Sequence, residues 1–328
     1  MGTLYVDRRN VELRQEGPRL LVYEAGERTG AIPVSHLDRV VIYRRAVVDT
    51  GVLASLAEHA VGLVVLSPRR PERTAHLVGR THNDIGRRIA QYARFHDEPW
   101  RVRWAAQIVT HKLRAQRRVL GAALRERPDQ RHALTTGMRA LEERLAALKG
   151  AGDGLTRGSV RGLEGAGAAA YFRALTAIFP DAVGFTGRNR RPPRDPVNAC
   201  LSLAYTLLHA EAVMACHGAG LEPLLGFYHE PAFGRVSLAA DLIEPLRPRV
   251  DGWTWDLFRS RALRAESFRR ERDACLLDKS GREVFYRAWE PFVRPVRRAL
   301  RRHAGMLARA LARDGTVFLA AGEEEDEP

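Results

Sequence analysis

An almost continuous apolar stretch around residue 200 constrains the fold of this chain more than any other feature. Asp195 precedes Pro196, a pair typical of a helix N-cap followed by proline in the first turn. Apolar residues then predominate over 197–216, and glycines follow at 218 and 220, where we expect the helix to end. A helix that is apolar on nearly all sides must be buried, so the other elements have to pack around it.

Charged and polar groups flank this helix in the sequence. A basic, proline-containing loop precedes it, and His229 follows it in a glycine-flanked loop. We expect a second helix over 237–246, in which Asp241 and Glu244 are three residues apart and therefore face the same way. A basic loop, a histidine and paired carboxylates within about sixty residues suit a hard metal ion beside a phosphate chain.

Residues 1–78 predict a small β-rich domain. Short segments rich in β-branched residues alternate with turn signals, and Asp49 or Thr50 can cap one helix over 51–60. The expected strands are 3–6, 11–14, 19–23, 30–33, 40–43 and 63–66. Because this domain contains neither a glycine fingerprint nor an acidic cluster, we interpret it as an assembly domain. A segment rich in proline and arginine at 67–73 marks its boundary.

The pattern turns helical after about Asn83, in a second domain over 79–320. Asp97 can cap a long helix over 98–126, whose basic face includes Arg101 and Lys112. Further helices are expected over 129–148 and 163–179, with a flexible loop at 152–162. The acidic tail, 321–328, is too charged to fold. The predicted class is α+β, with a small N-terminal β-rich domain followed by a larger all-α catalytic domain.

Basic residues outnumber acidic ones. The formal net charge is +14, and since the five acids at 323–327 contribute −5, the remainder carries +19. This excess favours a polyanionic partner such as nucleic acid, although an arginine-rich proteome would raise the charge in the same way. An arginine ladder at 294, 297, 298, 301 and 302 falls mostly on one helical face, as either a phosphate-binding or a solvated surface.

The sequence gives no sign of secretion or of a membrane partner. We identify neither a secretion signal nor a membrane-spanning segment. Cys200, Cys216 and Cys275 have no paired spacing, which argues against a disulfide framework and against a zinc site. These observations favour a cytoplasmic protein.

Glu164 lies in a segment rich in glycine and alanine, RGLEGAGAAAY, at 161–171. Gly165 and Gly167 allow another helix to approach closely, so we expect Glu164 at the start of a tightly packed helix. A carboxylate there is costly to bury unless it is paired or coordinating. The alternative is a first-turn glutamate that interacts with the helix dipole.

Asp241 and Glu244 share a helix whose other residues are apolar nearly all round, so both acids should be largely buried. Two buried carboxylates repel each other unless a proton or a cation intervenes. Carboxylates together with one imidazole suit Mg²⁺ or Mn²⁺ better than Zn²⁺ or Ca²⁺.

Four segments together resemble the signature blocks of a known family. In chain order they read RGLEGAGAAAYF, RRPPRDPVNACLS, GLEPLLGFYHEP and SLAADLIEPLRP. In content, order and spacing they are similar to those of the CRISPR-associated adaptation integrase and endonuclease family, “Cas-one”. The resemblance covers nearly the whole chain and is poor only in the C-terminal helix and the acidic tail.

This resemblance implies roles for individual residues. Glu164, His229 and Glu244 would be the ligands of a Mg²⁺ or Mn²⁺ ion. Asp241, the adjacent acid of the family pattern, would support them in the catalytic site. The DNA backbone would be bound by arginines of the basic loop, which are Arg188, Arg190, Arg191 and Arg194.

The resemblance also implies a reaction and partners. The family inserts short foreign DNA fragments (spacers) into a CRISPR array by transesterification, in which a 3′-hydroxyl attacks a phosphodiester. Expected partners are double-stranded DNA of the protospacer and the CRISPR repeat, a second copy of the chain joined through residues 1–78, and a small protein, “Cas-two”. The alternatives are a general metal-dependent nuclease for branched or single-stranded DNA and a non-catalytic DNA-binding scaffold.

Overall fold

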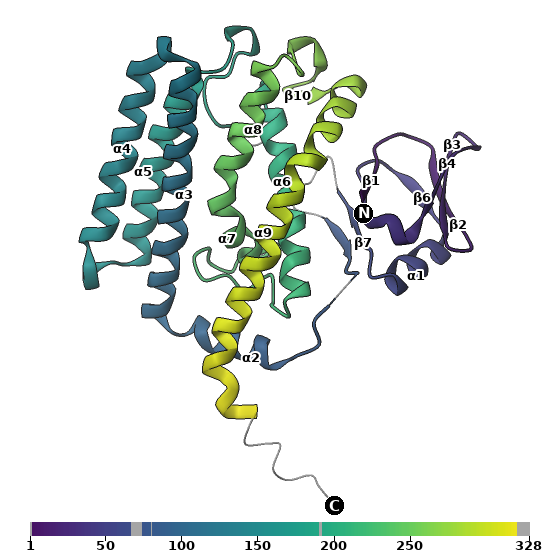
Figure 1. The fold of residues 1–328 in the computed structure, drawn as a ribbon, viewed down its shortest axis with the longest axis horizontal. Coiled ribbons are helices and arrows are strands. Elements are labelled where there is room, and N and C mark those ends of the chain that lie inside the picture. The colour runs from purple at the N-terminus through teal and green to yellow at the C-terminus, as the bar shows by residue number, and fades with distance from the viewer. Residues whose placement is uncertain (1, 67–73, 80, 190–191, 320–328) are drawn as a thin grey trace, which may run out of the picture.

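The structure is a computed structural model that describes residues 2–66, 74–79, 81–189 and 192–319. Three features of the sequence analysis lie outside these residues: the boundary segment at 67–73, the pair Arg190 and Arg191, and the acidic tail. A β-rich part over 2–77 lies beside a larger helical part (Figure 1), which confirms the predicted α+β class.

Two four-stranded sheets form the β-rich part. One has the order β1-β5-β7-β8 and the other the order β4-β3-β2-β6. Leu13 and Val40, on different sheets, are fully buried with Leu56 in one core. Helix α1 (Thr50–Glu58) begins after Asp49, whose side chain accepts a hydrogen bond from Gly51 N at 2.9 Å. The strands are β1 (Gly2–Val6), β2 (Val11–Glu16), β3 (Arg19–Glu24), β4 (Glu27–Pro33), β5 (Leu37–Ile42), β6 (Ala46–Val48), β7 (Gly62–Val65) and β8 (Ala75–Leu77).

Long helices make up most of the second part. Asp97 begins α3 as predicted, because its carboxylate accepts a hydrogen bond from Trp100 N at 3.0 Å. A short hairpin, β9 (Phe268–Glu271) and β10 (Ala274–Leu277), interrupts the helices and was not predicted. The helices are α2 (Gly86–Phe95), α3 (Glu98–Glu126), α4 (Arg131–Gly150), α5 (Arg157–Thr176), α6 (Pro196–Gly218), α7 (Ser237–Ile243), α8 (Arg247–Arg259) and α9 (Lys279–Leu319).

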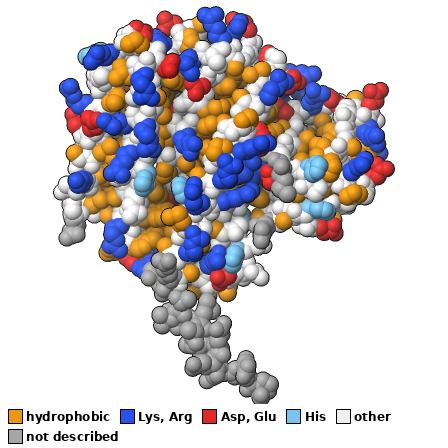
Figure 2. Space-filling view, viewed as in Figure 1, with side chains coloured by type: hydrophobic (Ala, Val, Ile, Leu, Met, Phe, Trp, Pro, Cys, Tyr) orange, Lys and Arg blue, Asp and Glu red, His pale blue; other side chains and the backbone are white. Residues whose placement is uncertain are grey.

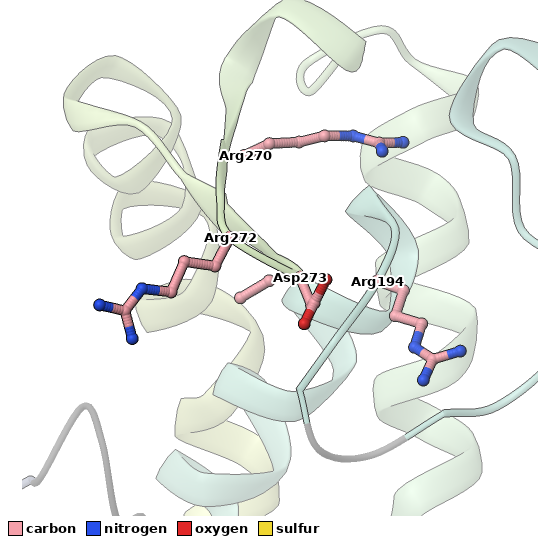
Figure 3. Close-up of a pocket in the computed structure, with 5 residues that line it drawn as sticks. Arg194, Arg270, Arg272 and Asp273 are labelled. Carbon is pink, nitrogen blue, oxygen red and sulfur yellow. The ribbon is translucent and has the colours of Figure 1, made fainter.

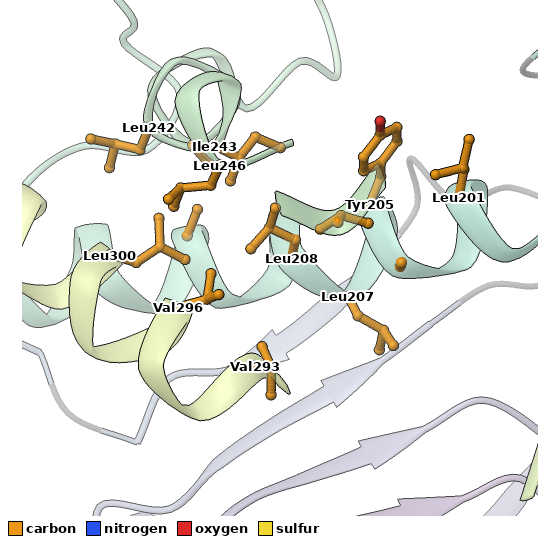
Figure 4. Packing of buried hydrophobic residues seen from close by; sticks show 14 of the residues in the cluster. Leu201, Tyr205, Leu207, Leu208, Leu242, Ile243, Leu246, Val293, Val296 and Leu300 are labelled. Carbon is orange, nitrogen blue, oxygen red and sulfur yellow. The ribbon is translucent and has the colours of Figure 1, made fainter. Parts of the chain in front are cut away.

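Helix α6 is the buried helix that the sequence predicts. Its N-cap is Asp195, which accepts a hydrogen bond from Asn198 N at 2.8 Å. Side chains of α6 such as Leu208 pack among Leu246 and Val296 from neighbouring elements (Figure 4). Among the described residues, α6 alone has the length and apolar composition of a membrane span, contrary to the sequence reading, but 67% of its most apolar window is buried inside the protein. Its apolar character therefore matches its place in the core.

Helix α5 begins earlier than predicted. Thr156 and Ser159 form a capping box, so residues 157–162 are helical and not a flexible loop. Glu164 consequently lies about two turns inside the helix, which rules out the first-turn alternative. A Cβ at Gly167 would lie 2.5 Å from Leu113 Cδ2 of α3, so this glycine does permit close packing, whereas Gly165 faces open space.

A buried ion cluster joins the two parts of the chain. Glu211 of α6 accepts hydrogen bonds from Arg297 Nε and Nη2 of α9 at 2.9 and 3.0 Å, and it pairs with Arg39 of β5 at 2.5 Å. Arg297 is therefore a buried structural residue and not part of an exposed ladder. The other ladder arginines, Arg294, Arg298, Arg301 and Arg302, are exposed. Basic side chains gather on the face along which α9 runs (Figure 2).

Candidate active site

Asp241 organises the loop that carries His229. Its fully buried carboxylate accepts hydrogen bonds from the backbone N–H groups of Phe227, Tyr228 and His229 at 2.7, 2.9 and 2.9 Å. The same carboxylate lies 2.6 Å from His229 Nδ1. An Nδ1–H that donates to a carboxylate leaves the lone pair of the imidazole on Nε2. Asp241 therefore orients the histidine and fixes its tautomer.

The same loop is held from its other side. Arg101 of α3 donates from Nε to Phe227 O at 3.2 Å and also pairs with Glu230, which Arg157 contacts as well. A Cβ at Gly226 would meet the backbone of Ser237 at 2.7 Å, so only glycine permits this approach of the loop to α7. His229 thus has a fixed position while its ring remains 27% exposed.

Glu244 lies directly after α7 and is buried. Its Oε1 is 2.9 Å from Arg247 Nε and 3.9 Å from His229 Nε2. Burial by itself would raise the pKa of Glu244, but Arg247 and Lys112 lower it to about 2. The carboxylate is therefore ionised at neutral pH. As predicted, Asp241 and Glu244 face the same way, and both are directed at one imidazole.

A lysine joins the two predicted metal-binding glutamates. Lys112 Nζ of α3 donates to Glu244 Oε2 at 2.5 Å and to Glu164 Oε1 of α5. Burial alone would lower the pKa of Lys112, but the two carboxylates raise it above its ordinary value. Glu164, His229 and Glu244 thus converge on one place in the fold, and the ammonium of Lys112 lies between the two carboxylates.

The donor chemistry at this place fits a hard divalent cation. Two carboxylates and an imidazole nitrogen with a free lone pair are suitable ligands for Mg²⁺ or Mn²⁺. Around an octahedral ion with bonds of about 2.1 Å, neighbouring ligand atoms lie about 3.0 Å apart and opposite ones about 4.2 Å apart. The 3.9 Å between His229 Nε2 and Glu244 Oε1 lies between these two separations. Among the described side chains, however, no group of three acidic, histidine or cysteine residues is already arranged around a common metal position.

Sequence reasoning missed the role of Lys112 because it assigned this residue to an exposed basic face. Lys112 and Arg101 are in fact buried, at 9% and 5% exposure. One available signal was helical spacing, since Lys112 lies four residues after the buried Ile108 and seven after the buried Ala105.

The predicted DNA-binding loop presents its arginines unequally. Arg188 donates to Asn198 Oδ1 at 2.7 Å and to Ser202 Oγ at 3.2 Å, so its guanidinium is engaged within the protein. Arg194 is exposed and lies near the tip of the unpredicted hairpin (Figure 3). Arg194 and the hairpin line a cavity of about 440 Å³, whose lining residues are Arg194, Arg270, Arg272, Asp273 and Ala274. A concave surface with three arginines suits a phosphate backbone.

Comparison with known proteins assigns this chain a family. Residues 4–291 match the family model described as CRISPR associated protein Cas1. A curated relative from Thermodesulfovibrio yellowstonii, “CRISPR-associated endonuclease Cas1 1”, is 33% identical over 321 residues, which cover 97% of this chain and 99% of the relative.

Solved structures have the same fold. A casposase bound to integration product superposes with a TM-score of 0.79 and 21% identity, over 94% of this chain and 91% of that one. A chain of a Cas6-RT-Cas1–Cas2 complex gives a TM-score of 0.78 and 22% identity, over 95% of this chain and 35% of that one. At these identities the likeness concerns the fold.

Proposed function

This chain belongs to the Cas1 family of CRISPR-associated endonucleases, and from that premise we propose that it inserts short DNA fragments into a CRISPR array by metal-dependent transesterification. The observation that carries the proposal is that Glu164 and Glu244 contact the same ammonium and that Glu244 Oε1 lies 3.9 Å from His229 Nε2. The three residues come from three separate segments of the chain. A shared fold alone would not require these side chains to meet.

In the proposed reaction, the 3′-hydroxyl of a fragment attacks a phosphodiester at the border of a repeat. One P–O bond forms, another breaks, and the displaced strand end leaves as a 3′-hydroxyl. A Mg²⁺ or Mn²⁺ ion bound by Glu164, His229 and Glu244 would acidify the attacking hydroxyl and offset charge on the phosphate.

The remaining residues of the site act by positioning. Asp241 holds the imidazole of His229 through its contact with Nδ1, so that Nε2 lies on the side of Glu244. Arg247 stabilises the ionised form of Glu244 through an ion pair at 2.9 Å. Arg194 and the hairpin arginines supply positive charge for backbone phosphates, without reading the base sequence.

The proposed partners are double-stranded DNA, a second copy of this chain and a Cas2-type protein. Their support is the likeness to a casposase bound to integration product and to a Cas1–Cas2 complex. Insertion into both strands requires two active sites, and we propose that residues 1–78 join two copies.

A second candidate function uses the same site. Hydrolysis and strand transfer differ only in the attacking oxygen, so these residues also suit cleavage of branched or single-stranded DNA. The relative from Thermodesulfovibrio yellowstonii is named an endonuclease, which favours DNA cleavage as an activity. A DNA-binding scaffold without catalysis is the remaining alternative.

An integration assay separates these functions. The chain and a Cas2-type partner would be incubated with labelled fragments, an array-bearing plasmid and a branched junction, in Mg²⁺, Mn²⁺ or EDTA. We expect metal-dependent insertion at the array that is lost in Glu164→Gln and in His229→Ala. Glu142→Gln, which changes an exposed glutamate of α4, is the matched control. Cleavage of the junction without insertion would favour the nuclease, and no reaction at all would favour the scaffold.

A further inference from the structure

Lys112 is an unusual residue in this chain. Only three of the 53 basic residues are lysines, namely Lys112, Lys149 and Lys279. The other two lie at the surface, whereas the side chain of Lys112 is 11% exposed and bonded to two carboxylates. A position that buries a lysine in a chain dominated by arginine calls for a physical reason.

The two residue types differ in how they neutralise carboxylates. Arginine binds a carboxylate with a planar, two-pronged group, as Arg297 does at Glu211. Lysine ends in a compact point charge on a flexible stem, which can withdraw without leaving a large cavity. An ammonium between two carboxylates therefore resembles a small metal cation in compactness and position, whereas a planar guanidinium does not.

We propose that Lys112 occupies the cation position between Glu164 and Glu244 until a divalent ion displaces its ammonium. This inference rests on the proposed metal site. In the metal-free protein, Lys112 keeps the two carboxylates close to their metal-binding arrangement by preventing their mutual repulsion. When the ion binds, it takes over these contacts, and the side chain of Lys112 moves away.

Two consequences distinguish this role from an ordinary structural ion pair. Removal of Lys112 destabilises the metal-free protein because the carboxylates lose their counter-charge. It also tightens metal binding because a competing cation is gone. If Lys112 were only a structural ion-pair partner, its removal would disrupt the site, and the metal ion would bind more weakly.

The test measures metal binding as well as stability. Lys112→Met keeps most of the length of the side chain and removes the charge. We expect a lower Tm than wild type in EDTA, a larger rise in Tm on addition of Mn²⁺, and Mn²⁺ binding that is about tenfold tighter by calorimetry, because one charge-assisted contact no longer competes. Lys149→Met should match wild type in all three measurements. Equal or weaker Mn²⁺ binding by folded Lys112→Met would overturn the proposal.

A second measurement uses the wild-type chain and does not depend on the stability of a variant. Because there are three lysines, ¹³Cε-lysine labelling gives three assignable NMR signals. Saturating Mg²⁺ should move the signal of Lys112 towards the positions of the two exposed lysines and leave those unchanged. If calorimetry detects Mg²⁺ binding and the Lys112 signal does not move, displacement is wrong while the proposed function stands. If neither Mg²⁺ nor Mn²⁺ binds, both proposals fail.

Discussion

Two places in the described part of this molecule bury a glutamate between two cations, and they differ in what surrounds them. At the junction of the two parts, Glu211 lies between Arg39 and Arg297, and the three side chains are 4–6% exposed. At the candidate site, Glu244 lies between Lys112 and Arg247. Burial and ion pairing alone therefore do not distinguish a structural cluster from a functional one.

The surroundings do distinguish them. In the Glu211 cluster, two buried arginines contact both oxygens of the carboxylate, so neither oxygen is left for another ligand. The Glu244 cluster has further potential ligands, since Lys112 also contacts Glu164 and His229 Nε2 lies 3.9 Å from Glu244 Oε1. The side chains of Glu164 and His229 are 19% and 27% exposed. One cation there is a lysine, whose contacts a metal ion can replace. Potential ligands beyond the ion pairs, at an accessible edge, therefore set the candidate site apart from the structural cluster.

The largest expected effect comes from removing one charge at each place. Glu244→Gln should reduce integration by about 10²–10³-fold, because charge stabilisation in the transition state is lost, and it should leave a folded protein. Glu211→Gln should cost about 3–5 kcal/mol of unfolding free energy, because two buried arginines lose the negative charge of the carboxylate that they share. Urea unfolding and the integration assay, applied to both variants, test this contrast. Equal loss of stability in the two variants would remove the distinction between the clusters.

Asp241→Asn should have the next largest effect. An amide in this position no longer fixes the tautomer of His229, so Mn²⁺ should bind about 10–100-fold more weakly. Calorimetry with Mn²⁺ measures this change, and circular dichroism checks that the loop and helices are retained. Wild-type affinity in this variant would contradict the positioning role of Asp241.

A third buried carboxylate, Asp251, extends the comparison, because hydroxyls replace cations as its partners. Tyr171 donates to it at 3.0 Å, and Tyr205 donates as well. Burial raises the pKa of Asp251 from 3.8 to about 6, despite these hydrogen bonds. Since the folded-state pKa lies above the unfolded value, this group stabilises the fold below pH 3.8, and the contribution is lost as pH rises to about 6.

Asp251→Asn removes this titration. Its unfolding free energy relative to wild type should rise between about pH 4 and 6 and then level off. Glu211→Gln should show the opposite trend, because its two arginines lower the pKa of Glu211 although burial alone would raise it. Urea unfolding from pH 4 to 7 tests both variants, and a flat difference for Asp251→Asn would mean that Asp251 does not titrate in this range.

The smallest effect concerns the exposed basic surface. Arg194→Ala should weaken DNA binding a few-fold and lower the slope of log affinity against log salt by about one. Arg298→Ala, on the exposed face of α9, is a comparison variant that shows whether the loss is specific to the cavity. Fluorescence anisotropy at several salt concentrations measures both, and an unchanged slope for Arg194→Ala would remove this residue from the interface.

Much of the fold followed from local signals in the sequence. Asp97 and Asp195 predicted the starts of α3 and α6 correctly, because an N-cap acts within one helical turn. β-Branched segments located most strands of the first domain, although the three-residue strands β6 and β8 escaped detection. The start of α5 was placed wrongly, because glycines at 152–162 outweighed the capping box at Thr156.

The sequence by itself predicted several of the long helices and the strand-rich first domain, and its resemblance to a family predicts Glu164, His229 and Glu244 as site residues. Only the tertiary structure decided which charged side chains form ion pairs with one another. Lys112 is 52 residues from Glu164 and 132 from Glu244, and Arg297 is 86 residues from Glu211. Helical periodicity and capping act over a few residues, whereas an ion pair depends on which helix faces pack together. For this reason the sequence placed both basic residues on exposed faces, and the packing of α3, α5, α6 and α9 buried them.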